Sequence, residues 1–162
     1  MDEVKQNHKL PEDNALPVQD RLGFLITRTS WAVRSHMDQF IRSLGVSLSP
    51  EQWIALNWLY NHPGSSQQDL VEVLGKHKAN ITRILAGLAK QGYVYRSEDP
   101  KDRRRVLLSL SSESNEMMNQ VLPQVLGEYH YITQDLGPQE KAAVKSALAK
   151  ITKRALERKQ TN

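Results

Sequence analysis

Residues 64 to 111 read GSSQQDLVEVLGKHKANITRILAGLAKQGYVYRSEDPKDRRRVLLSLS, and this stretch decides the fold of the chain. Its apolar spacing predicts two helices, from about Gln67 to Leu74 and from about Lys78 to Gln91. Each is followed by a glycine, which tolerates the left-handed conformation that ends a helix. Residues rich in Tyr, Val and Leu then predict two short strands, from about Tyr93 to Ser97 and from Val106 to Leu110, joined by a charged loop. This order of elements is a helix-turn-helix followed by a β-hairpin wing.

The second of these helices has an apolar stripe, which predicts the face that is buried. The stripe consists of Ile81, Ile84, Leu85 and Leu88. Most of the remaining side chains are polar or basic and suit the major groove, because they can donate to base edges and phosphates. An arginine-rich hairpin tip suits the minor groove, where the potential is most negative. The expected DNA-binding residues are Ser65, Gln67, Lys76, Lys78, Asn80, Thr82, Arg83, Arg103, Arg104 and Arg105.

The wing carries a likeness to a known family. The segment DPKDRRRVLLSLS, which begins at Asp99, resembles the DPxDRRxxxxxLT signature of MarR-type transcription regulators. The run ITRILAGLAKQGYVYR, which begins at Ile81, resembles their recognition helix and the strand after it, and the likeness covers about residues 18–157. Ser111 stands where the family usually has Thr, and Ser114 where Gly is common.

The resemblance implies a dimeric, sequence-specific, double-stranded DNA-binding transcription regulator that acts as a repressor. Activation stays open as well, because it depends on where the binding site lies relative to a promoter. Arg103 and Arg104 match the two arginines of the family motif. By the same resemblance, Asp102 orients an arginine and at least one arginine enters the minor groove, so Asp102 joins the expected DNA-binding residues.

The distribution of charge favours the same function. The net charge is +4 overall, but residues 76–105 alone carry nine basic and three acidic side chains. A localised basic patch is the electrostatic signature of phosphate binding. Three consecutive arginines by themselves would more often form a solvated turn, whereas behind a helix-turn-helix they favour contact with DNA.

Length and composition exclude several classes of protein. The 162 residues suit one domain, or one domain with an extension, and 39% hydrophobic and 25% charged residues are ordinary for a soluble globular protein. The absence of Cys excludes disulfides, Cys-ligated zinc and thiol redox sensing within the chain. No apolar run approaches 18 residues and the N-terminus does not resemble a signal peptide, so we expect a cytoplasmic protein without a membrane partner.

The flanking segments predict helices that join two subunits. A long helix is expected from about Val18 to Leu44, and Ser49 can cap a second one that opens at Pro50. After the wing, Ser111 or Ser112 can cap a helix that contains Pro123 and runs to about Leu136, and a last helix is expected over 138–158. Ser65 or Ser66 can cap the first helix of the helix-turn-helix.

The chain thus divides into four expected parts, and the fold class is mainly α with a small β-hairpin wing. These are a flexible arm (1–17), an N-terminal dimerisation helix (18–48), the winged helix-turn-helix (49–111) and C-terminal dimerisation helices (112–162). Apolar surface on more than one side of the flanking helices, together with the resemblance, implies a homodimer. A two-fold dimer places two recognition helices in successive major grooves and reads a pseudo-palindromic operator.

The resemblance also implies release from DNA by a small aromatic or phenolic effector. The chain offers aromatic faces that could hold a ring, and basic groups that could meet a carboxylate or phenol oxygen. The candidate ligand-binding residues are Trp31, Arg34, His36, Met37, Trp53, Trp58 and Tyr129. Taken one at a time, each of these residues is more often part of a core or an interface.

Two alternatives stay open at this stage: a winged helix that docks another protein, and a DNA-binding regulator that needs no ligand. An enzyme is not expected, because no Ser/His/Asp grouping, Gly-rich phosphate loop or paired-carboxylate motif stands out. The five His residues lack metal-ligand spacing, so neither a metal nor a cofactor is expected.

Overall fold

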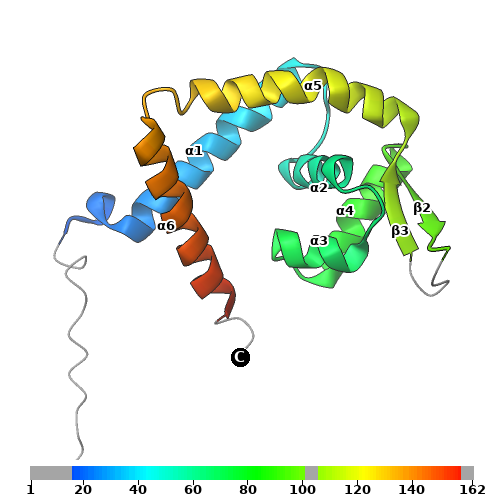
Figure 1. The fold of residues 1–162 in the computed structure, drawn as a ribbon, viewed down its shortest axis with the longest axis horizontal. Helices are drawn as coiled ribbons and strands as arrows, with labels where there is room; N and C mark the ends of the chain where they lie inside the picture. Colours follow the sequence, from blue (N-terminus) through cyan, green and yellow to red (C-terminus); the bar gives the residue numbers. More distant parts are fainter. Residues whose placement is uncertain (1–15, 101–105, 158–162) are drawn as a thin grey trace, which may run out of the picture.

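The computed structural model describes residues 16–100 and 106–157, and its elements follow the predicted order (Figure 1). In chain order they are the 3₁₀ helix η2 (Val18–Asp20), α1 (Leu22–Ser43), α2 (Pro50–Asn61), β1 (Ser65–Ser66), α3 (Gln67–Leu74), α4 (Lys78–Lys90), β2 (Val94–Glu98), β3 (Val106–Leu110), α5 (Ser112–Tyr131) and α6 (Pro138–Glu157). The fold is mainly helical with one small sheet, as predicted. Within these residues, no helix combines the length and the apolar composition that crossing a membrane requires.

Serine side chains fix where the central helices begin. Ser49 and Gln52 form a reciprocal capping box at the start of α2, where Pro50 takes the first helical position. At the start of α3, the backbone N–H of Ser66 donates to Asp69 Oδ2 at 2.7 Å, and the N–H of Asp69 donates to Ser66 Oγ at 3.3 Å. The turn between α3 and α4 is short because Gly75, with φ 58°, ends α3 in the left-handed conformation.

The wing is part of a three-stranded antiparallel sheet with the order β1-β3-β2. Val94 pairs with Leu110 and Glu98 with Val106, so β2 and β3 form the predicted hairpin. The sequence did not predict β1, whose two serines carry no apolar alternation and whose partner in β3 lies more than 40 residues along the chain. Ser65 pairs with Leu108 and thereby ties the helix-turn-helix to the wing.

The hydrophobic core lies inside the winged helix-turn-helix. Leu56 of α2, Leu70 of α3 and Leu88 of α4 have no exposed surface, and neither does Met118 of α5. The predicted stripe of α4 is buried throughout, with Ile84 the most exposed of its four members at 9%. Because each such side chain contributes about 1.5–3 kcal/mol when buried, this stripe fixes the rotation of α4 about its own axis.

Two predicted helix boundaries are wrong. The helix expected from Val18 begins at Leu22, because Arg21 has extended backbone angles and separates α1 from η2. The helix expected to reach Leu136 ends at Tyr131. Beyond Tyr131 the backbone N–H groups of Thr133 and Gln134 donate three residues back, to the carbonyls of His130 and Tyr131 at 3.2 Å each, so the chain continues as turns and not as an α-helix.

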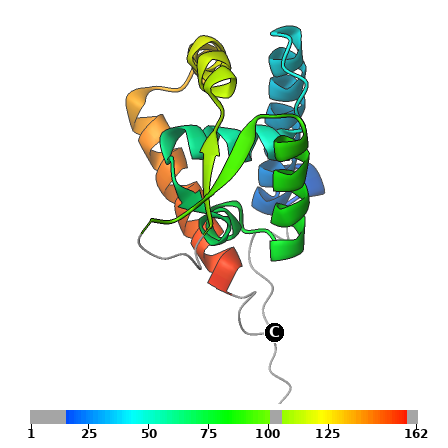
Figure 2. The same ribbon diagram turned by 90° about the vertical axis from the view of Figure 1, so that its right-hand side faces the viewer.

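The flanking helices extend away from this core. Helix α5 leaves the wing and crosses α1, where His36 Nε2 and Glu128 Oε1 lie 2.5 Å apart. Helix α6 then turns back from the far end of α5; it overlaps α1 in Figure 1, but Figure 2 shows that the two are separated in depth. No residue of α6 is buried, and the only buried residues of α1 are Met37 and Ile41.

Candidate DNA-binding interface

The exposed side of α4 carries the polar side chains that the sequence predicted. Lys78, Asn80, Thr82 and Arg83 are all exposed on α4, whereas its apolar stripe faces α2 and α3. The hydroxyl of Thr82 accepts a hydrogen bond from Gln67 Nε2 at 2.7 Å, which joins this helix to the first residue of α3. The structure thus brings Gln67 beside Thr82 and leaves all four polar α4 side chains exposed outside the buried stripe.

A polar cleft of about 410 Å³ lies on the side of α4 that faces α2. Asn80 and Arg83 line it together with Lys76 from the turn before α4 and Glu51 from the first turn of α2. Lys76 Nζ lies 3.8 Å from Glu51 Oε1, so this lysine, one of the expected DNA contacts, is already paired with a carboxylate.

Glu51 also binds α1, since Arg34 Nη1 donates to Glu51 Oε1 at 3.0 Å. Burial by itself raises the pKa of Glu51. A backbone hydrogen bond, the hydrogen bond from Arg34 and the charges of Arg34 and Lys76 together outweigh burial and hold the pKa below its usual value. One carboxylate therefore links the first helix to the turn of the helix-turn-helix.

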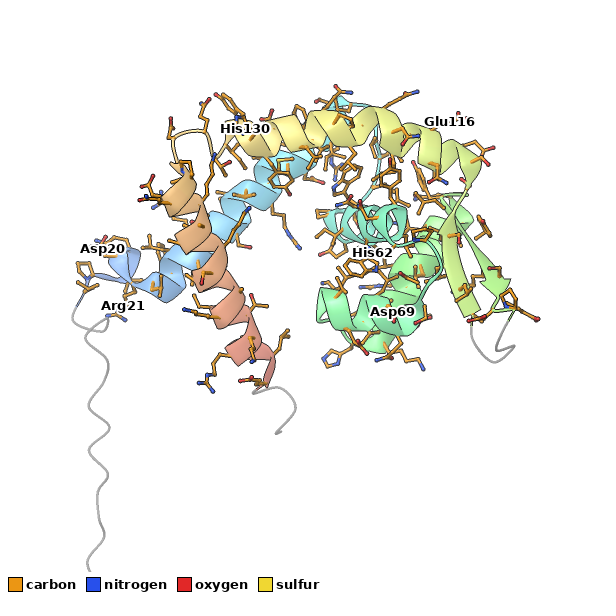
Figure 3. All side chains as sticks on the ribbon, viewed as in Figure 1. Asp20, Arg21, His62, Asp69, Glu116 and His130 are labelled. Atoms are coloured by element: carbon orange, nitrogen blue, oxygen red, sulfur yellow. The ribbon has the colours of Figure 1, made fainter. Side chains whose placement is uncertain are left out.

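Ser65 was expected to contact DNA, but in the structure its side chain is buried and already hydrogen-bonded. Its Oγ donates to the carbonyl of His62 at 2.8 Å, and Trp58 Nε1 donates to that Oγ at 3.3 Å. The local pattern could not show this, because the contacts depend on how α2 meets β1. Figure 3 labels His62, whose carbonyl accepts this hydrogen bond from Ser65. It also labels the neighbouring Asp69, which completes the α3 cap.

The remaining predicted contacts lie in the wing tip. Asp102, Arg103, Arg104 and Arg105 fall outside the described residues. The hairpin that carries them is described up to Pro100 on one side and from Val106 on the other. Two exposed basic residues were missed by the sequence-based selection: Arg96 on β2 and Lys90 at the end of α4. The concentration of positive charge in residues 76–105 was the signal that could have included them.

A second cavity, of about 180 Å³, lies among α1, α2 and the end of α5. Four of the seven predicted ligand residues line it: Arg34, Met37, Trp53 and Tyr129. Other lining residues were missed, namely Ser30, Val33, Asp38, Ile41, Leu48, Pro50 and Ile54. Ser30, Val33, Asp38 and Ile41 each lie four residues from Arg34 or Met37, so helical spacing could have identified them. The other three depend on how α2 packs.

The other three predicted ligand residues do not line this cavity. Trp31 is 71% exposed, and His36 is paired with Glu128. Trp58 stacks on His62 with ring centroids 3.7 Å apart and donates its N–H to Ser65. At the cavity, burial raises the pKa of Tyr129. A phenol is protonated at neutral pH in any case, so the Tyr129 hydroxyl can donate a hydrogen bond.

The similarity to known proteins agrees with this geometry. A sequence model of the MarR family matches residues 45–105. The HTH-type transcriptional regulator YfiV of Bacillus subtilis (strain 168) is 31% identical over 112 residues, which are 69% of either chain. The chain belongs to the MarR family. It is accordingly a DNA-binding transcriptional regulator and not an enzyme, as the sequence predicted.

Other MarR-family relatives cover more of the chain. The HTH-type transcriptional regulator FarR of Neisseria gonorrhoeae is 27% identical over 139 residues, which are 85% of this chain and 95% of FarR. The solved structure of the transcriptional repressor CouR, bound to a 23-mer DNA duplex, superposes with a TM-score of 0.71 at 25% identity. That match covers 89% of this chain and 97% of CouR, so the flanking helices are part of the shared MarR-family fold.

We expect Glu51→Gln to lower the free energy of unfolding by about 0.5–1 kcal/mol at pH 7, the size of a partly exposed ion pair. Because folding lowers the pKa of Glu51, the stabilisation is present above the unfolded value near 4.5 and is lost as the pH falls through the folded value. Urea unfolding of both proteins at pH 7 and pH 3 measures the difference. Glu116→Gln, an exposed site on α5 (Figure 3), is the control. A difference that persists at pH 3 would contradict the assignment.

Proposed function

We propose that the protein is a homodimer that represses transcription from a pseudo-palindromic operator, and that a small aromatic compound with an acidic group releases it. The observation that carries the DNA-binding part is the exposed surface of α4, where Lys78, Asn80, Thr82 and Arg83 lie outside a buried stripe. A helix of this kind offers donors to base edges while its apolar side holds it rigidly on the domain.

The expected DNA contacts in and just before α4 divide by their place along the chain. Asn80 and Arg83 are the base-reading pair, because Asn suits adenine and Arg suits guanine in bidentate contacts. Lys76 and Lys78, near the start of α4, contact phosphates and set the register on the duplex. Arg103 and Arg104, at the wing tip, enter the minor groove. Repression follows where such an operator overlaps a promoter, and CouR, a DNA-bound repressor, supports this reading.

Apolar surface on the flanking helices supports a homodimer. Within the described residues, α6 has none of its side chains buried, yet Val144 is 44% and Leu148 46% exposed. Helix α1 exposes Phe24 at 41% and Trp31 at 71%. Apolar patches of this extent mark interaction surfaces, and a second copy of the chain covers them with the same residues through a two-fold axis. In this arrangement 18–48 and 112–162 dimerise, and 49–111 binds DNA.

The cavity among α1, α2 and α5 supports an effector with a ring and an acidic group. Its apolar walls include Met37 and Trp53, and Arg34 supplies positive charge at its edge. A ligand carboxylate competes with Glu51 for Arg34. Glu51 then has Lys76, 3.8 Å away, as its remaining cationic partner and holds it more strongly against the pull of a DNA phosphate. Ligand binding therefore costs DNA affinity.

We expect Arg83→Ala to weaken operator binding by about 1–3 kcal/mol and to relax the preferred sequence at one position of each half-site. The operator is first selected from a random duplex pool, and affinity is then measured by fluorescence anisotropy at fixed salt. Lys145→Ala, on α6, is the control for loss of one positive charge. Parallel losses on operator and random duplex would show that Arg83 contacts only phosphate. A winged helix that docks proteins would select no duplex and show no steep salt dependence.

We expect Leu148→Asp to shift the protein towards a monomer, because a charge would be buried in the interface without a partner. Sedimentation equilibrium of wild type and variant measures the mass. Ser146→Asp is the matched control, since Ser146 is exposed on the opposite side of α6. A wild-type monomer, or a fully dimeric Leu148→Asp variant, would contradict this interface.

We expect salicylate to change the fluorescence of Trp53 and to lower operator affinity at saturation. Arg34→Gln should weaken salicylate binding about tenfold or more, as loss of a hydrogen bond to a charged group predicts. Trp31→Phe should keep the response, because Trp31 does not line the cavity. If a panel of aromatic acids neither binds nor changes operator affinity, the regulator works without such a ligand.

A further inference from the structure

Thr82 holds an unusual position on the DNA-facing helix because the protein itself uses its hydroxyl group. The side chain is exposed on α4. Its Oγ1 donates to the backbone carbonyl of Lys78 at 2.9 Å and accepts from Gln67 Nε2 at 2.7 Å. A threonine hydroxyl has a single proton, and here that proton is already committed to the helix backbone.

The same two bonds determine the orientation of the Gln67 amide. Since the Thr82 proton goes to Lys78, the hydroxyl can only accept from Gln67, so the amide must present its NH₂ group. The first residue of α3 and the fifth residue of α4 are thereby locked together. Both were expected to contact DNA, and the structure shows that they act as one unit.

The committed proton limits what Thr82 can recognise. In the major groove, N7 and O6 of guanine, N7 of adenine and O4 of thymine are all acceptors, and a hydroxyl without a free proton cannot donate to them. The methyl group and one acceptor lone pair of the hydroxyl remain, and two hydrogen bonds hold the side chain in one rotamer. A contact made by an already ordered group loses less entropy on binding.

We propose that Thr82 reads a thymine in each half-site through a methyl–methyl contact, and that Gln67 is the positioning residue that holds it. The thymine C5-methyl projects into the major groove and is the natural partner of a threonine methyl. The inference rests on the proposed function, because α4 must lie in that groove.

The test replaces each thymine of the selected operator with deoxyuridine, which removes only the C5-methyl group. Wild type is compared with Thr82→Val, which keeps the methyl and loses the hydroxyl, and with Thr82→Ser, which does the reverse. At one thymine in each half-site, wild type should lose about fourfold in affinity for each uracil, the contribution of one buried methyl group. Thr82→Val keeps the methyl group but loses the bond to Gln67, so its loss at the same thymine should be smaller. Thr82→Ser should show no loss there.

Two further variants separate positioning from general effects. Gln67→Met has a side chain of similar length but cannot make the bond to Thr82. It should reduce the loss of affinity that uracil causes at that same thymine, and it should leave the loss at other positions unchanged. Thr27→Ser is the matched control: Thr27 Oγ1 donates to the carbonyl of Gly23 at 2.9 Å, an equivalent bond on exposed α1, far from α4. It should keep the wild-type uracil pattern.

The outcomes distinguish this inference from the proposed function. Equal uracil penalties in wild type and Thr82→Ser at every position would overturn the methyl contact while leaving operator binding intact. Loss of operator binding in Thr82→Val but not in Gln67→Met would show instead that the hydroxyl touches DNA, and an operator without thymine would also overturn the proposal. A wild-type protein that selects no operator would overturn the proposed function and this inference together.

Discussion

Burial of one side of α4 is the constraint on which the rest of the interface depends. Ile81, Leu85 and Leu88 are at most 1% exposed, and each contributes about 1.5–3 kcal/mol, more than the 0.5–1.5 kcal/mol of a typical hydrogen bond. Rotation by one residue turns an α-helix by about 100° and would bring Arg83 towards the core. The apolar stripe therefore decides which polar side chains of α4 are exposed and available for the proposed contacts with DNA, although its own members are buried.

The need to bury an apolar face also explains why the flanking helices leave apolar side chains exposed. Apolar side chains at helical spacing are buried where a neighbouring element covers them, as Met37 and Ile41 of α1 are beside α5. Where no described element covers them they are exposed, as Leu148 of α6 is. Hydrophobic periodicity identifies the apolar face of a helix but not the element that covers it. In α4 the partner lies close along the chain, whereas for α6 we assign it to a second subunit.

Local signals predicted most of the fold, and long-range contacts account for the failures. The ends of α3 and α4 follow from glycines and spacing, and the cap of α2 follows from Ser49 and Pro50. Strand β1, the burial of Ser65 and the exclusion of Trp58 from the α1–α2–α5 cavity all depend on residues brought together from different elements. The candidate DNA surface was therefore predicted better than the cavity, whose walls come from three helices.

The small free energy of the Glu51 ion pairs limits how far the proposed effector can lower DNA affinity through them. Glu51 lies in the first turn of α2, where the helix dipole already favours a carboxylate, so exchanging Arg34 for Lys76 costs little. A partly exposed ion pair contributes at most about 1 kcal/mol, or roughly fivefold in affinity for each subunit. Allosteric coupling is commonly about 1–3 kcal/mol. In the proposed mechanism, the ion pairs therefore supply the lower part of that range. Any stronger release requires a change in the distance between the two recognition helices of the proposed dimer, because they must remain about 34–36 Å apart to enter successive grooves.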